Sequence, residues 1–153
     1  MNRTPTIPAT RTLPLLDRLA TEIRDEERKL GGAQRELSRL RSGVATAQTA
    51  LAEARELQEL AVATGDTRET LHYLHIVELR QSDLTDAEAR LADSPSNGDA
   101  ARATTRIAGL RGQVQAEERK RAQAEAARVE AQRVAALPLR HTPFAALRGA
   151  MAA

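Results

Sequence analysis

The chain has 153 residues, which suits a single domain, a net charge of +2, and only one Tyr and one Phe. It contains no Cys, which excludes disulfides and thiolate metal sites. A globular core of this size normally uses several aromatic side chains, so the Ala-, Arg-, Glu- and Leu-rich composition favours long helices instead. We expect an all-α fold, an elongated antiparallel coiled coil of two or three long helices with flexible termini.

Charge is unevenly distributed along the chain. All 21 acidic residues lie between Asp17 and Glu130, whereas five Arg lie outside that span. The central part is therefore slightly acidic, and the high pI of about 9.6 comes from the ends. An acidic body with almost no aromatic residues to stack on bases disfavours nucleic-acid binding.

Residues 1–12 contain Pro5 and Pro8, which disfavour helix and predict an extended N-terminal arm. Beyond the arm, a helical coiled-coil body is predicted over 13–137. Its first helix, from about Leu13 to Val62, carries residues spaced alternately three and four apart, the pattern of a coiled-coil seam. The seam positions are Leu16, Leu19, Ile23, Glu26, Leu30, Ala33, Leu37, Leu40, Val44, Ala47, Leu51 and Ala54. Because only Glu26 is not apolar and the phase continues through Gly31-Gly32, we expect one continuous helix.

A tight turn is predicted near 63–66, where Gly65 suits the left-handed residue after a helix. Asp66, three residues before Glu69, has the form of a capping box. The second helix, 67–92, begins with an apolar stretch that covers more than one face. We therefore expect this segment to be contacted on two sides.

The segment 93–99 combines Pro, Asn-Gly, Asp and Ser, which is turn chemistry, and Asp99 is a candidate cap for a third helix over 100–137. The apolar stripe of this helix is good from Ala103 to Val114 and then thins. Pairs such as Glu125–Arg128 support the helix beyond that point.

The second helix reaches back only to about Leu37–Leu40, so the earlier part of the seam needs cover from the third helix or from a second chain. This predicts a homo-oligomer. The predicted self-association seam consists of Leu16, Leu19, Ile23, Leu30 and Leu37.

Pro138 ends the third helix, and the tail 138–153 has its own helix-start signal at Thr142-Pro143. Phe144, Leu147 and Met151 would share one face of a short docking helix. Such anchors fit a groove on a partner protein, the chain's own bundle or, less well, a membrane surface.

Glu69, His72, His75 and Glu78 follow at three-residue steps, and Glu-x-x-His is a ligand spacing of di-metal bundles. Three-residue steps rotate by about 60° each, so the four residues share one face poorly. We expect surface histidines, with no metal site, no cofactor and no catalytic residues. Without a nucleophile motif or phosphate loop, the chain is not expected to be an enzyme. It has no apolar run for a signal peptide or membrane span, which makes a cytoplasmic location the expectation.

With Leu15-Leu16 and Arg18 opening the first helix, a turn near Gly65, and Leu79-Arg80 in the return helix, residues 15–136 resemble the hairpin coiled-coil stalk proteins of flagellar and type III secretion export systems. That resemblance implies a hairpin that contacts a hexameric export ATPase and helps couple it to the export gate. It assigns no role to individual residues. Scaffolding or tail-associated helical components of phage particles share the same pattern. The function expected from the sequence is a non-enzymatic coiled-coil structural or adaptor protein that self-associates and docks a protein partner through its C-terminal helix.

Overall fold

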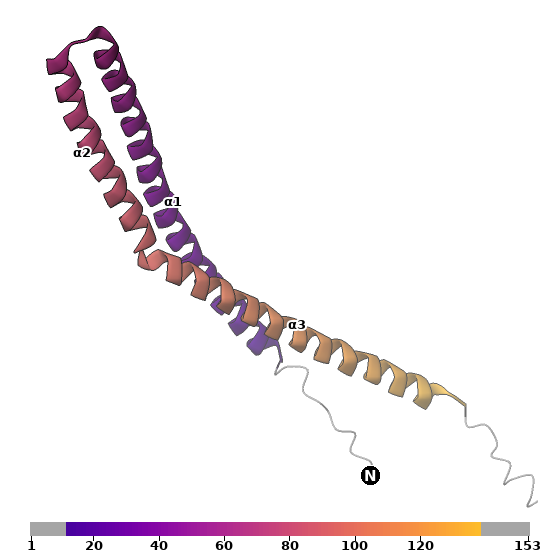
Figure 1. The fold of residues 1–153 in the computed structure, drawn as a ribbon. Helices are drawn as coiled ribbons and strands as arrows, with labels where there is room; N and C mark the ends of the chain where they lie inside the picture. The colour runs from indigo at the N-terminus through magenta and orange to yellow at the C-terminus, as the bar shows by residue number, and fades with distance from the viewer. Residues whose placement is uncertain (1–11, 139–153) are drawn as a thin grey trace, which may run out of the picture. The chain divides into compact units, whose positions relative to one another are not determined.

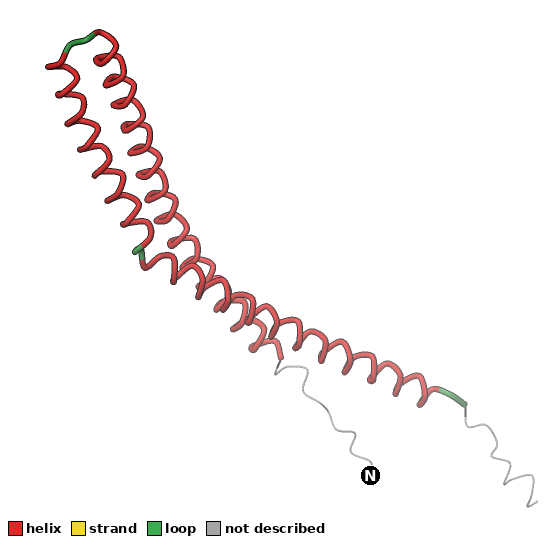
Figure 2. Tube along the Cα trace, in the orientation of Figure 1, coloured by secondary structure: helices red, strands yellow, loops and turns green. Residues whose placement is uncertain are grey.

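The computed structural model describes residues 12–138, which contain three α-helices and, within that range, no strand (Figures 1 and 2). The helices are α1 (Thr12–Thr64), α2 (Thr67–Ala92) and α3 (Pro95–Ala136). This confirms the all-α prediction. None of these described helices has an apolar stretch that is long enough to cross a membrane.

Helix α1 continues for 53 residues and passes through Gly31-Gly32 without interruption. Two consecutive Gly cost about 2 kcal/mol relative to Ala in a helix interior. The seam offsets this cost, because Leu19, Ala33 and Leu37 on either side of the pair are all buried. Packing of one stripe therefore decides the continuity of α1.

The turn between α1 and α2 is built around Gly65, which has a φ of +75°. Its N–H donates to the Val62 carbonyl at 3.1 Å, closing the end of α1. The Asp66 carboxylate then accepts from the N–H groups of Arg68 and Glu69, at 2.9 and 3.0 Å. These bonds satisfy backbone donors that the first turn of a helix leaves without partners.

The junction between α2 and α3 differs from the sequence prediction. Helix α3 begins at Pro95, five residues before the expected start, and Asp99 lies inside the helix, where it pairs with Arg102. The physical reason is that Ser94 acts as the cap, accepting from the Ser96 N–H at 3.3 Å, while Pro95 occupies the first helical position. Residues that are typical of a long turn here start a helix.

Asn97 joins the two helices at this junction. Its side-chain amide donates to the carbonyl oxygens of Leu91 at 2.9 Å and Ser94 at 3.3 Å. The last carbonyls of a helix have no partner within the helix, so this contact satisfies acceptors at the end of α2. The break between α2 and α3 is consequently only two residues long, at Asp93–Ser94.

Residues 17–112 form one compact unit, which holds most of α1, all of α2 and the first part of α3. It contains every buried apolar side chain of the described residues, and none of these is large and aromatic. These side chains are Leu19, Ala33, Leu37, Leu51, Ala54, Ala61, Leu84, Ala103, Ile107 and Leu110. The core is therefore a narrow stripe.

The second unit contains residues 113–136 of α3 among its described residues. Val114 is half-buried, but the large apolar side chains further along α3 are exposed, Val129 by 53% and Val134 by 56%. Ion pairs along the helix surface link Glu125 to Arg128 at 3.1 Å and Glu130 to Arg133 at 3.8 Å. As expected from the sequence, this segment carries charge pairs where an apolar stripe is lacking.

Candidate functional site

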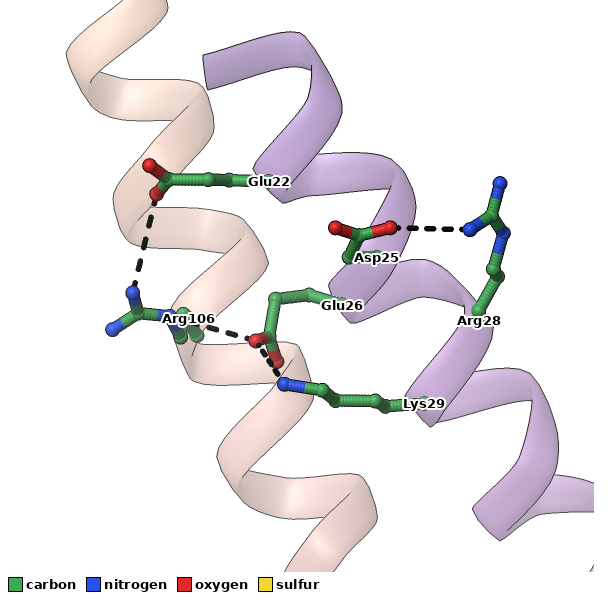
Figure 3. A network of polar contacts seen from close by, with 6 residues as sticks. All are labelled: Glu22, Asp25, Glu26, Arg28, Lys29 and Arg106. Carbon is green, nitrogen blue, oxygen red and sulfur yellow. Dashed lines mark hydrogen bonds and ion pairs between the residues drawn. The ribbon is translucent and has the colours of Figure 1, made fainter. Parts of the chain in front are cut away.

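Glu26, the one charged residue of the seam, lies where α1 meets α3 (Figure 3). Its side chain is only 12% exposed, and its Oε1 atom lies 2.9 Å from Lys29 Nζ and 3.6 Å from Arg106 Nε. Arg106 also approaches Glu22, at 4.0 Å. The guanidinium thus bridges two carboxylates of α1 from α3. A half-buried carboxylate requires such partners, since burying it alone would cost several kcal/mol.

A second ion pair joins the same two helices, where Arg111 Nη2 is 3.0 Å from Glu27 Oε1. Each of these pairs joins residues that are about 80 positions apart in the chain. Charge therefore fixes which part of α3 lies beside the early part of α1.

A groove of about 830 Å³ opens beside Glu26, between α1 and the start of α3. Small residues, Gly32, Ala33 and Ala103, form part of its lining, and this leaves space between the helices. Its charged side chains already pair with one another, Lys29 and Arg106 with Glu26. The groove therefore presents few uncommitted charges to a ligand.

The ends of α1 and α2 next to the Gly65 turn have a different character, because large apolar side chains there are exposed. Their exposed fractions run from 41% to 62%. These residues are Leu57, Leu60, Val62, Leu71, Leu74 and Leu79. Isolated exposed leucines are ordinary, but several large apolar side chains exposed at one end of a helix pair favour an interaction there.

The same end of the molecule is acidic. Residues 51–92 contain nine acidic residues and four Arg, a net formal charge of −5. Within the described residues, the side-chain hydrogen bond that joins α1 to α2 is between Arg55 and Gln81, at 3.2 Å. Ion pairs thus connect α1 to α3, whereas near the turn the acidic side chains are exposed to solvent.

The seam residues that we predicted to self-associate are largely covered within one chain. Leu19 and Leu37 are 3% and 6% exposed, and Leu16, Ile23 and Leu30 are half-buried. The prediction named two possible covers for this part of the seam, the third helix and a second chain. Helix α3 provides cover, since its Ala103, Ile107 and Leu110 are buried and its Arg106 contacts Glu26. Self-association through this seam remains a prediction, and Leu16, Ile23 and Leu30 keep part of their surface accessible.

Two further sets of predicted residues are the histidines of α2 and the C-terminal docking residues. His72 and His75 are exposed, and the His72 ring packs edge-on against Tyr73 at 5.3 Å. Between residues 12 and 138 no three His, Asp or Glu side chains converge as metal ligands would. The predicted docking residues Phe144, Leu147 and Met151 lie outside the described residues.

The sequence predicted only part of the exposed apolar group near the turn. The apolar start of α2 predicted contact on two sides, and the structure provides one of them, α1. The phase slip at Leu57 and Leu60, which leave the seam spacing, was the available signal for the same feature on α1.

Comparisons with protein-family models, with curated proteins and with solved structures found no match for this chain.

Proposed function

We propose that this chain is a non-enzymatic coiled-coil adaptor or assembly component that self-associates and docks a protein partner. The observation that carries the proposal is the group of large apolar side chains exposed at the turn end of α1 and α2, up to 62% for Leu60. Exposing them to water is unfavourable, and a partner that covers them gains about 25 cal/mol for each Å² of apolar surface.

In this proposal residues 17–112 form an antiparallel coiled coil. Two contacts support that order, because Arg55 bonds to Gln81 while the earlier Glu27 bonds to the later Arg111. Residues further from the Gly65 turn on α1 thus meet residues further along the returning chain. The buried seam, with members three and four residues apart such as Ala103, Ile107 and Leu110, supports the coiled-coil spacing.

The proposal is tested by sedimentation equilibrium of the full chain between low and high micromolar concentration, together with a variant that lacks residues 138–153. We expect the full chain to form oligomers and the deletion to weaken its assembly while circular dichroism stays helical. A full chain that is monomeric at all concentrations would contradict the self-association part.

The alternative function is that of an export stalk, which the resemblance suggests and the turn-linked pair of long helices favours. It predicts a monomeric chain that stimulates ATP hydrolysis by a cognate hexameric export ATPase.

A scaffolding or tail role in a phage particle predicts incorporation into particles instead. Weak nucleic-acid binding predicts salt-sensitive retention of DNA or RNA, and no shift at low salt would eliminate it.

A further inference from the structure

Four apolar residues near the turn, of which Leu57, Leu60 and Leu79 are exposed and Ile76 is half-buried, lie at matching levels of α1 and α2 in the antiparallel arrangement proposed above. The hydrogen bond between Arg55 and Gln81 sets the level of the two helices. Leu57 and Leu79 each lie two residues closer to the turn than Arg55 and Gln81, so these two leucines are at the same level. Leu60 and Ile76 lie three residues closer still and are also at the same level.

These four residues also share one face of the pair. Relative to the buried seam residues Ala54 and Ala61, Leu57 lies about a seventh of a turn and Leu60 about a third of a turn to one side. Relative to the buried Leu84 of α2, Ile76 and Leu79 lie about a quarter and about two-fifths of a turn away in the same rotational sense. In an antiparallel pair, offsets of the same sense place residues on the same side, whereas Arg55, Gln81 and Leu71 fall on the other. We call Leu57, Leu60, Ile76 and Leu79 the distal apolar face.

Acidic side chains border the distal apolar face. Glu53 and Asp86 are exposed on it and form no ion pair within the described residues, and the adjacent Asp83 pairs with Arg80 at 3.3 Å. If two copies met through this same face about a two-fold axis parallel to the helices, these carboxylates would lie together. Like charges across an interface are unfavourable, so the complementary occupant is apolar and basic.

The C-terminal segment 139–153 has that chemistry. It contains Arg140 and Arg148, no acidic residue, and the apolar side chains Phe144, Leu147 and Met151 at three- and four-residue intervals. Aromatic and Leu anchors that insert between helices, with Arg at the rim, are typical of helix-surface recognition.

The segment is assigned to another copy because, within residues 17–112, the first part of α3 lies far along α1 from the face. Arg111 of α3 pairs with Glu27, which lies 30 residues before Leu57 on α1. At 1.5 Å per residue this separation is about 45 Å. We propose that the distal apolar face of one copy binds residues 139–153 of a second copy. Such a contact joins two different surfaces, so it allows copies to add one after another. It rests on the proposed function and names the surface through which self-association occurs.

The test uses two full-length variants. A face variant carries Leu60→Gln and Leu79→Gln, and a tail variant carries Phe144→Ser and Leu147→Ser. We expect each substitution pair to raise the self-association Kd by at least about tenfold, as loss of central apolar anchors does. An equimolar mixture should form a heterodimer, because it contains one intact face and one intact tail. Higher salt should weaken this heterodimer by screening the Arg–carboxylate attraction.

The matched control is Leu71→Gln, since Leu71 is 60% exposed and Leu60 is 62% exposed, on opposite sides of the pair. Leu71→Gln should associate like the wild type, and circular dichroism should show that every variant remains helical. Two results would overturn the surface assignment while leaving the proposed self-association intact. One is a face variant that associates like the wild type, and the other is a mixture that stays monomeric although the wild type oligomerises. A wild-type chain that is monomeric throughout would instead defeat the proposed function itself.

Discussion

Arg106 Nε of α3 lies 3.6 Å from Glu26 Oε1 of α1, and Glu26 is the one charged member of the seam. The two residues are separated by most of α1 and all of α2. A charged seam residue lowers stability relative to a well-packed apolar one, but it favours the register in which its partner is present. The pair therefore favours one alignment of α3 on α1 over slipped ones.

Replacing Arg106 with Ala should destabilise the chain by about 1 kcal/mol, because Glu26 keeps only Lys29 as a partner. Arg102→Ala is the control, since Arg102 pairs with Asp99 within α3 and is exposed. That substitution should cost only a few tenths of a kcal/mol, about the value of an exposed pair. Urea unfolding followed by circular dichroism measures both. Equal costs would show that the contact between α1 and α3 adds nothing.

Glu26→Leu should complete the apolar seam and raise the free energy of unfolding by about 1 kcal/mol. In the Glu26→Leu background, Arg106→Ala should cost less than in the wild type, with a remainder from the Glu22 contact. The double-mutant cycle gives this coupling directly. A coupling of zero would mean that the two charges do not interact in solution.

Leu51→Ala should cost about 2–3 kcal/mol, because Leu51 is 4% exposed and its truncation leaves a cavity beside Ala54. Leu60→Ala, on the same helix, should change stability by less than about 0.5 kcal/mol because Leu60 projects into solvent. Denaturant midpoints of the two variants test the placement of the seam. A large cost at Leu60 would show that its side chain is covered within the chain.

Asp66→Ala should destabilise the α1–α2 turn by about 1 kcal/mol through loss of the bonds to the Arg68 and Glu69 amides. Asp66→Asn keeps an acceptor oxygen and should cost much less. Thermal unfolding distinguishes the two, and hydrogen exchange of the Arg68 and Glu69 amides locates the effect. If Asp66→Asn were as harmful as Asp66→Ala, the negative charge and not the cap would be the cause.

The pKa of Glu36 is lowered by the hydrogen bond from Arg39 and by its positive charge. A carboxyl whose pKa is lowered by folding stabilises the protein above its ordinary pKa, and this contribution is lost as the pH falls through the lowered value. Glu36 is well hydrated, so the gain in stability is small. NMR titration of its carboxyl carbon should show a midpoint that returns toward the ordinary value in Arg39→Gln. An unchanged midpoint would exclude the pair as the cause.

Local chemistry and periodicity were sufficient to anticipate much of the fold. Gly65 and Asp66 marked the turn because their backbone and capping preferences act over a few residues. The continuity of α1 through Gly31-Gly32 followed from the phase of the apolar repeat. The start of α3 was misjudged, because Ser94, Pro95 and Asn97 suit both a turn and a helix start, and the contact of Asn97 with the Leu91 carbonyl selects the helix.

By itself, the sequence determined that the chain is helical, that α1 ends near Gly65, and which stripe of α1 must be covered, since each of these depends on neighbours within a turn or two. Only the tertiary structure decided what covers that stripe. Glu26 was a defect in the repeat until α3 brought Arg106 to it from 80 residues away. Likewise, Leu60 and Leu79 were ordinary apolar residues until the packing of α1 on α2 left both in solvent, because exposure depends on what lies opposite and not on local sequence.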